Sequence, residues 1–533
     1  MPANNTELEK KLWDAADELR ANSKLKSSEY SMPVLGLVFL KWADFKFAYA
    51  QRELEEETKK SSTHRRREIS KVSYQARGVI YVPDKARYSR LMTLPESADI
   101  GRAINDAMEL IEAENEDLRG VLPRTFQNFE SRMLLSLLRI FNSIPMDVEG
   151  DVFGKIYEYF LGKFAMAEGQ KGGEFFTPTS VVRLIVEILE PFHGRIYDPA
   201  CGSGGMFVQS ARFVREHRKN PSEEISIYGQ ERVSETVKLC KMNLAVHGLA
   251  GDIREGNSYY EDIHNSSHRF DFVMTNPPFN VDRVDKERLK GDRRFTLGIP
   301  GVDNANYLWI QMFYSALGPS GRAGFVMANS AGDARSSELE IRKKILDEDA
   351  IDAIISLGPN LFYTVTLPCT LWFLDLGKKH TSRTGMVLFI DARGIYRQID
   401  RSHRDLTLAQ IEFIADIVRL YRGQTPSFDY ATNDDRVLGQ SSLDDWRSMF
   451  VGNKYRDILG LCKAASKKDI EEQDWSMNPG RYVGVVLEDQ SGVGFYSDLS
   501  YLRDQFDALS AEAKRRECEV KETLERLLGV KRP

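Results

Sequence analysis

The sequence has few cysteines, and they are not arranged as metal ligands. Its 533 residues contain five, with no CxxC pair and no His/Cys cluster: Cys201, Cys240, Cys369, Cys462 and Cys518. Scattered single cysteines fit a reducing compartment and argue against a structural zinc site. We therefore expect a cytoplasmic protein without a bound metal.

Long apolar runs are also lacking. The longest apolar stretches, such as VLGLVFL (34–40), are far shorter than the roughly 18 residues that a membrane span needs. The opening segment MPANNTELEKKLWDAADELR has no basic region followed by an apolar one, so we expect no export signal. These absences predict a soluble chain that does not contact a membrane.

The third absence is a basic excess. Lys and Arg number 73 against 79 Asp and Glu, which gives a formal net charge of −6. A protein that binds nucleic acid unaided usually has a strongly basic balance, because neutralisation of phosphates dominates its affinity. If DNA is the substrate, another subunit is expected to supply much of the binding.

The chain is long enough for several domains, and the pattern of predicted helices and strands changes along its length. Residues 1–148 are predicted to form a helical domain, because a capping box at Thr6–Glu9 precedes apolar residues at helical spacing. Within 149–440, strands alternate with helical stretches, which favours an α/β fold with a mostly parallel sheet. The predicted strands are 195–198, 225–229, 271–275, 322–330, 352–357, 369–376 and 386–391. Residues 441–533 are expected to be helical.

A glycine-rich turn follows the first predicted strand, in YDPACGSGGMF (197–207). Gly202, Gly204 and Gly205 allow a tight turn and close approach of the backbone to a ligand at the start of a helix. Asp198, at the tip of the strand, can hold a ligand ammonium group. A turn of this kind also occurs for structural reasons alone, so the neighbouring segments must decide.

Two further segments follow in order. Glu231 ends the second predicted strand, 26 residues after Gly205, close to the spacing of about 20 at which an acidic residue binds ribose hydroxyls. The other segment is DFVMTNPPFN (271–280), where Pro277 and Pro278 stop a buried strand because neither can donate to a sheet ladder. Alone, these segments read as a surface glutamate and a strand-terminating turn.

Together, the glycine turn, the acidic residue and NPPF resemble an S-adenosylmethionine-dependent amino-methyltransferase. EFFTPT (174–179), placed before the glycine turn, resembles the cofactor-covering segment of DNA adenine methyltransferases. With the helical N-terminal region and with NPGRYVGV (478–485) before a helical tail, the whole chain resembles the modification (M) subunit of type I restriction-modification systems.

The resemblance implies a doubly wound, mostly parallel sheet of the methyltransferase fold, and it implies a site. The implied contacts of S-adenosylmethionine are Glu174, Phe175, Phe176, Thr177, Pro178, Thr179, Asp198, Pro199, Gly202, Ser203, Gly204, Gly205, Glu231 and, at the adenine ring, Asp252. The implied catalytic residues are Asn276, Pro277, Pro278 and Phe279.

These catalytic residues suit the activation of an exocyclic amine, whose lone pair is delocalised into the base ring. The Asn276 side-chain oxygen and the Pro277 carbonyl can both accept hydrogen bonds from that amine, which localises the lone pair. The base must be flipped out of the duplex, and Phe279 can stack on it. The implied reaction is adenine-N6 methylation of double-stranded DNA.

The resemblance also implies partners: a specificity (S) subunit that sets the DNA site, a restriction/translocase (R) subunit and a second M subunit. An apolar seam with coiled-coil spacing is the expected dock for a partner helix, although it could pack on the chain itself: Leu499, Leu502, Phe506, Leu509, Ala513, Val520 and Leu527. The basic stretches 59–71 and 283–294 are either solvated loops or DNA contacts.

Two other functions remain open on the residues alone. NPP-aromatic motifs also suit a protein-glutamine or RNA amino-methyltransferase, because those substrates carry planar amines. A non-catalytic scaffold of the same fold is the second alternative, and the intact Asp198, Gly202, Glu231 and Asn276 speak against it.

Overall fold

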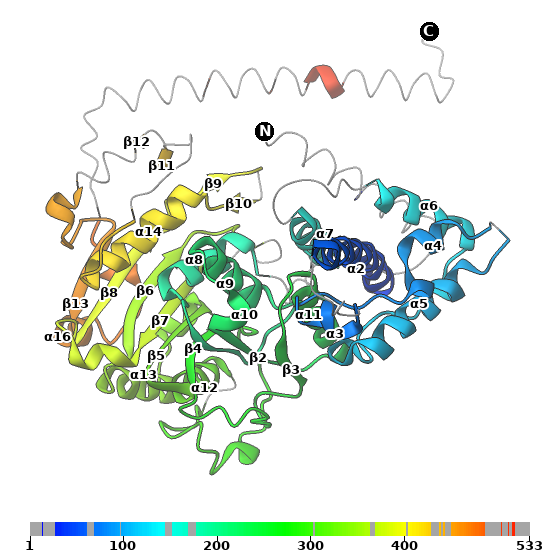
Figure 1. Cartoon of the computed structure of the whole chain (residues 1–533). Helices are drawn as coiled ribbons and strands as arrows, with labels where there is room; N and C mark the ends of the chain where they lie inside the picture. Colours follow the sequence, from blue (N-terminus) through cyan, green and yellow to red (C-terminus); the bar gives the residue numbers. More distant parts are fainter. Residues whose placement is uncertain are drawn as a thin grey trace, which may run out of the picture. The chain divides into compact units, whose positions relative to one another are not determined.

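A nine-stranded sheet lies at the centre of the chain (Figure 1). The computed structural model describes residues 13, 27–60, 69–95, 97–143, 152–168, 177–301, 304–362, 368–400, 403–427, 436–438, 441–442, 449–485, 503, 510 and 514–517. In chain order the strands of this sheet are β1 (Gly194–Asp198), β2 (Ile225–Glu231), β3 (Gly251–Glu255), β4 (Phe270–Thr275), β5 (Leu317–Ala328), β6 (Ile351–Leu357), β7 (Cys369–Asp375), β8 (Met386–Ala392) and β13 (Cys462–Ser466).

The strand order is β13-β8-β6-β7-β5-β4-β1-β2-β3. Only β7 and β13 run antiparallel to their neighbours in this sheet. The chain proceeds from β1 outward through β2 to β3 and then returns to the other side of β1 with β4. Ligands of such sheets bind beyond the carboxyl ends of the strands, at the point where the order reverses. That point lies between β1 and β4.

Helices cover both faces of the sheet, which confirms the predicted doubly wound architecture (Figure 1). Neighbouring residues of one strand pack on opposite faces of the sheet: Val326 of β5 lies in one apolar cluster, whereas Phe325 lies in the other. Strands buried on both faces read as continuous apolar runs, which is why hydropathy predicts them. The helices on one face include α8 (Thr179–Leu189), α9 (Gly205–Glu216), α11 (Ser234–Val246) and α14 (Leu408–Tyr421), and those on the other include α12 (Asn306–Ala316) and α13 (Ser337–Asp347).

The N-terminal part is helical, as predicted, and has an apolar cluster of its own. Its described helices up to the expected bound at residue 148 are α2 (Ser27–Lys60), α3 (Lys71–Gln75), α4 (Tyr88–Met92), α5 (Ile100–Glu114) and α6 (Ser131–Asn142). α7 (Val152–Glu168) lies beyond that bound, and it packs in the same cluster through residues such as Tyr157 and Phe160. Met242 and Val246 of α11 complete this cluster. The helical part therefore packs directly on a helix of the sheet region.

Part of the region after residue 440 differs from the expectation of a helical region. β13 (Cys462–Ser466) lies within the stretch predicted to be helical, and it extends the sheet by pairing with β8. α16 (Lys467–Glu472) directly follows β13 and is helical, and other short elements of the described chain are α10 (Pro221–Glu224), β9 (Arg397–Gln398), β10 (Arg404–Asp405), β11 (Arg436–Leu438) and β12 (Ser441–Ser442). The chain divides into two compact units, Met1–Val483 and Gly484–Pro533. The residues of the predicted apolar seam lie outside the described part of the chain.

Candidate active site

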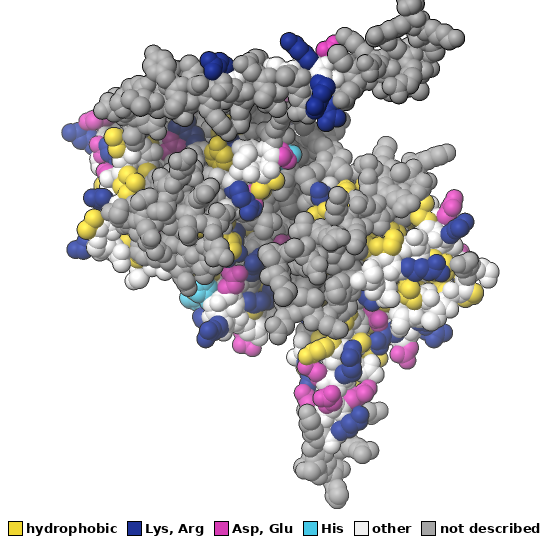
Figure 2. All heavy atoms as spheres, turned by 90° about the horizontal axis from the view of Figure 1, so that it is seen from above, with side chains coloured by type: hydrophobic (Ala, Val, Ile, Leu, Met, Phe, Trp, Pro, Cys, Tyr) yellow, Lys and Arg dark blue, Asp and Glu magenta, His cyan; other side chains and the backbone are white. Residues whose placement is uncertain are grey.

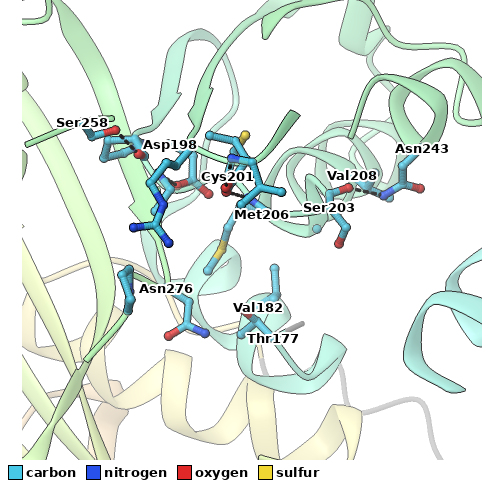
Figure 3. Close-up of a pocket in the computed structure, with 18 of the residues that line it drawn as sticks. Thr177, Val182, Asp198, Cys201, Ser203, Met206, Val208, Asn243, Ser258 and Asn276 are labelled. Carbon is cyan, nitrogen blue, oxygen red and sulfur yellow. Dashed lines mark hydrogen bonds between the residues drawn. The ribbon is translucent and has the colours of Figure 1, made fainter. Parts of the chain in front are cut away.

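A pocket of about 230 Å³ opens beyond the carboxyl ends of β1, β2 and β4. Asp198 is the last residue of β1, Glu231 is the last residue of β2, and Asn276 directly follows β4. All three line the pocket, together with most of the glycine-rich turn. The pocket thus lies where the strand order reverses, and it collects the three segments singled out from the sequence (Figure 3).

The glycine-rich turn owes its shape to two left-handed residues, Gly202 (φ +51°) and Gly204 (φ +82°). A Cβ atom on Gly204 would lie 2.8 Å from the sulfur of Cys240, so close packing against α11 also requires glycine. Asn243 of the same helix donates a hydrogen bond to the Ser203 carbonyl at 2.8 Å. The turn is therefore held open toward the pocket by a neighbouring helix.

Asp198 is a buried carboxyl in this pocket, with 2% of its surface exposed. Its Oδ1 accepts a hydrogen bond from the Ala200 N–H at 3.0 Å. Burial raises the pKa of Asp198 to about 7, and the nearby Glu231 carboxylate adds to the rise. A negative charge here is costly until a positive group joins it, which suits a site for a ligand ammonium.

Glu231 links the end of β2 to the glycine-rich turn. Its Oε2 accepts from the Gly202 N–H at 3.2 Å, and its Oε1 accepts from the Val233 N–H at 3.0 Å. Each carboxylate oxygen keeps a further lone pair that can accept a ligand hydroxyl. The side chain is buried and lines the pocket, so it is not the surface glutamate of the alternative interpretation.

Asp252 lies outside the pocket, so it is removed from the predicted cofactor contacts. It is the second residue of β3, far from the carboxyl end of that strand, and it forms an ion pair with Arg254 at 2.7 Å. Asn257, Ser258 and Tyr259, which follow β3, line the pocket instead. Ser258 also donates to the Pro199 carbonyl at 2.5 Å, which joins this segment to the glycine-rich turn.

The NPPF segment forms one side of the pocket. Asn276 and Pro278 line it, whereas Phe279 is partly buried and packs against the apolar cluster that contains α8 and α9. The Oδ1 atom of Asn276 is buried and has no hydrogen-bond partner among the described residues. Figure 3 shows Asn276 on the same side of the pocket as Thr177 and Val182.

The segment before the glycine-rich turn is described only in part. Thr177 and Thr179 line the pocket, and Pro178 is the residue that precedes α8. Glu174, Phe175 and Phe176 lie outside the described residues, so their predicted role is not addressed by the structure.

The basic stretch 283–294 is divided between the interior and the surface. Arg294 is buried, pairs with Asp292 and donates to the carbonyls of Ser258 and Tyr259 at 2.7 and 3.1 Å. It thus supports the pocket wall and does not face solvent. Arg283, Lys290 and Arg293 have side chains 87%, 66% and 65% exposed.

Several pocket residues had no signal in the sequence. Glu158 comes from α7 of the N-terminal part, and Trp309 from α12, and both helices read as ordinary apolar helices. Asn257 could have been found, because a polar residue just beyond a parallel strand occupies the same place as Glu231 and Asn276. The predicted site residues are thus only a part of the pocket lining.

The pocket residues fit S-adenosylmethionine. Asp198 presents a buried carboxyl, and each carboxylate oxygen of Glu231 keeps a lone pair beside the glycine-rich turn. Such acceptors match a ligand that carries an ammonium group and hydroxyls, because a buried acceptor left without a donor costs free energy.

Comparison with known proteins is decisive about the family. Residues 148–490 match the family model described as N-6 DNA methylase, and residues 8–138 match the HsdM N-terminal domain. The chain belongs to the N-6 DNA methylase family. Its reaction is transfer of a methyl group from S-adenosylmethionine to the N6 amine of adenine in DNA.

The chain is similar over almost its whole length to curated members of this family. It is 36% identical to the type I restriction enzyme MjaIX methylase subunit of Methanocaldococcus jannaschii, with 98% of this chain and 91% of the relative covered. It is 37% identical to the HindI methylase subunit of Haemophilus influenzae, with 80% and 92% covered. These matches confirm the resemblance to type I modification subunits.

A solved structure agrees on the fold. The methyltransferase subunit of a type I restriction-modification system from Streptococcus thermophilus superposes with a TM-score of 0.68 at 23% identity, covering 90% of this chain and 99% of that chain. Within the described part of the chain, no helix has the length and apolar character needed to cross a membrane. The described residues also contain no cluster of His, Cys, Asp and Glu suited to a metal ion.

Proposed function

We propose that this chain is the modification subunit of a type I restriction-modification complex and that its catalytic acceptor is Asn276. The observation that carries the proposal is the buried, unpartnered Oδ1 of Asn276, at the carboxyl end of β4 and in the same pocket as Asp198. When bound, S-adenosylmethionine supplies a methyl group on a positively charged sulfur. Asp198, Glu231 and the turn from Gly202 to Gly205 are the proposed contacts that hold it.

Asn276 and Pro277 are proposed to act on the target amine. The Asn276 Oδ1 and the Pro277 carbonyl accept hydrogen bonds from the two amine hydrogens, so the nitrogen lone pair is less delocalised into the base ring and can attack the methyl carbon. The bond from that carbon to sulfur breaks as the bond to nitrogen forms, and the nitrogen then loses one proton to solvent. Acceptors fixed in advance toward developing positive charge are each worth roughly 10²–10³ in rate. Pro277 and Pro278 limit the backbone torsions of the segment, and this keeps the acceptors in place.

The target adenine is proposed to leave the duplex, because its amine cannot enter the pocket while the base is paired and stacked. Phe279 is the proposed stacking partner of the flipped base. Its ring is partly buried, so one part packs on the protein and another part is accessible. Stacking on an aromatic side chain is worth about 1–3 kcal/mol per base.

Binding to double-stranded DNA is proposed to depend on partners. The net charge is −6, and basic and acidic side chains are interspersed on the face shown in Figure 2. Relatives named as methylase subunits of type I restriction enzymes support an assembly with a specificity subunit, a restriction subunit and a second modification subunit. The sequence pattern of residues 499–527 favours that segment as the dock for the specificity subunit. Such a complex works on chromosomal DNA, so we place the chain in the cytoplasm.

The exposed part of the stretch 283–293 is the proposed DNA contact of this chain itself. The Tyr260 hydroxyl accepts a hydrogen bond from the Asp285 N–H at 2.8 Å, and the Arg288 guanidinium lies 4.1 Å from the centre of the Tyr260 ring. Tyr260 directly follows the pocket-lining Tyr259, so the stretch is attached beside the pocket. Basic side chains at this place suit the phosphates that flank a flipped base.

The experiment that tests the function is analysis of nucleosides in DNA treated with the complex of this chain and its specificity subunit. N6-methyladenine is the expected product, and Asn276→Ala should abolish it while cofactor affinity stays within about twofold, since the lost contact serves the transition state. Formation of N4-methylcytosine, or a variant that keeps more than about a tenth of the rate, would contradict the assignment. Methylated protein or RNA in place of DNA would favour the alternative amino-methyltransferases.

A further inference from the structure

The catalytic segment ends at a residue in the left-handed region. Asn280, directly after Phe279, has φ = +52°, a conformation that asparagine tolerates better than most residues. Its backbone N–H donates to Oδ1 of Asn306 at 2.9 Å, and Nδ2 of Asn306 donates to Oδ1 of Asn280 at 2.9 Å. The two asparagines form a closed pair that fixes the backbone and the side chain of Asn280 together.

The side chain and backbone of Asn306 are held in place by burial and by hydrogen bonds. It is the first residue of α12 and only 2% of its surface is exposed. Asn304 accepts a hydrogen bond from the Asn306 N–H at 2.8 Å and donates to Oδ1 of Asn280 at 3.2 Å. One turn further along α12, Trp309 is 3% exposed and lines the pocket. The first turn of the helix is therefore anchored in the core beside the asparagine pair.

The segment between the two anchors has little freedom. At its start, Thr275 is fully buried and paired with Phe325 in the sheet. Pro277 and Pro278 have φ fixed near −65° by their rings. At its end, Asn306 holds Asn280. The position of the Asn276 oxygen thus depends on a few torsions between two rigid points, one in β4 and one in α12.

We propose that Asn306 is a positioning residue for methyl transfer: by clamping Asn280, it aims the Asn276 oxygen and the Pro277 carbonyl at the target amine. The inference rests on the proposed function of Asn276. Hydrogen bonds of Asn306 go to the catalytic segment, whereas Asp198 and Glu231 belong to other strands. Loss of the clamp should therefore reduce the rate of the chemical step and leave cofactor binding intact.

The test uses the complex of this chain with its specificity subunit under single-turnover conditions on its DNA site. Asn306→Ala should reduce the methyl-transfer rate by roughly tenfold to a hundredfold, the scale of a displacement of about 1 Å at a reacting group. Its affinity for S-adenosylmethionine, measured by calorimetry, should stay within about twofold of the unsubstituted chain. Amide hydrogen exchange in the peptide that contains Phe279 and Asn280 should become faster.

Two further variants separate positioning from general packing. Gln311→Ala is the matched control, because buried Gln311 lies on the same helix and bonds to Leu297, Gly298 and Tyr307 rather than to the catalytic segment. Its rate should stay within about threefold, even if its melting temperature falls. Asn280→Gly keeps the backbone bond to Asn306 and the left-handed conformation, so it should lose less rate than Asn306→Ala.

The proposal is overturned if Asn306→Ala keeps the full rate, if its cofactor affinity falls as much as its rate, or if Gln311→Ala or Asn280→Gly slows transfer equally. These outcomes are distinct from failure of the proposed function. If the unsubstituted complex makes no N6-methyladenine, the function itself is wrong, and the amide-exchange result alone then reports on the clamp.

Discussion

Replacement of Asp198 by Asn should stabilise the ligand-free protein while weakening its binding of S-adenosylmethionine. The carboxyl has an ordinary pKa of 3.8 in the unfolded chain and about 7 in the folded one, chiefly because it is buried. Each pKa unit corresponds to roughly 1.4 kcal/mol, so ionised Asp198 lowers the free energy of unfolding by up to about 4 kcal/mol. Asparagine keeps the oxygen that accepts from Ala200 and carries no charge.

The pH dependence follows from the direction of the shift. Between pH 4 and 7 the folded chain holds a proton that the unfolded chain has lost, so stability falls as pH rises and is level above about 7. The gain in unfolding free energy from Asp198→Asn should therefore be about 4 kcal/mol at pH 8 and about 1.5 kcal/mol at pH 5. Urea denaturation at the two pH values measures it, and calorimetry at pH 8 measures the loss of cofactor affinity.

A matched substitution on the neighbouring strand provides the control. Asp271→Asn on β4, which pairs with β1, changes a half-exposed carboxylate outside the pocket, so it should change the free energy of unfolding by at most about 1 kcal/mol and leave cofactor affinity unaltered. The reasoning fails if Asp198→Asn destabilises the chain at pH 8, or if its effect is the same at both pH values. Either result would show that the folded protein already compensates the buried charge without a ligand.

Two other substitutions test the remaining parts of the site. Glu231→Gln should weaken binding of S-adenosylmethionine by about 1.5–3 kcal/mol in calorimetry, the scale of a hydrogen bond to a charged group, and an unchanged affinity would remove Glu231 from the site. Changing Arg283, Lys290 and Arg293 together to Gln should reduce the dependence of log affinity for DNA on log salt by up to about 3, at roughly 0.9 per phosphate contact. An unchanged slope, measured on the complex with its specificity subunit, would assign these side chains to solvent.

The strands predicted correctly are those whose own residues are enough to identify them. Strands such as β4 and β7 are buried on both faces, so their apolar runs identify them without any knowledge of their neighbours. β13 was missed because CKAAS contains small and polar residues of low strand preference. Its conformation comes from pairing with β8, as in the alignment of Ala464 with Leu388, and that partner lies far away in the chain.

In the site, too, some residues could be located from the local sequence, whereas the location of others depends on the rest of the fold. Asp198 and Asn276 could be placed because each stands at the end of a recognisable strand, where pockets of parallel sheets open. Asp252 was misplaced because the bounds of β3 were not known, and three residues in position decide which end of the strand a side chain occupies. Arg294 reads as one more surface cation in a basic stretch, and only the fold shows it buried against Ser258 and Tyr259.

The glycine-rich turn has a consequence for anyone who would move this site to another protein. Its backbone is held from outside at successive points: Pro199 by Ser258, Cys201 by the Gln230 carbonyl, Gly202 by Glu231 and Ser203 by Asn243. The contacts come from β2, α11 and the segment after β3. The conformation of the eight-residue motif DPACGSGG thus depends also on three other parts of the chain. A graft of the motif alone would transfer its composition without its shape, whereas a graft that includes the three supports would transfer the pocket.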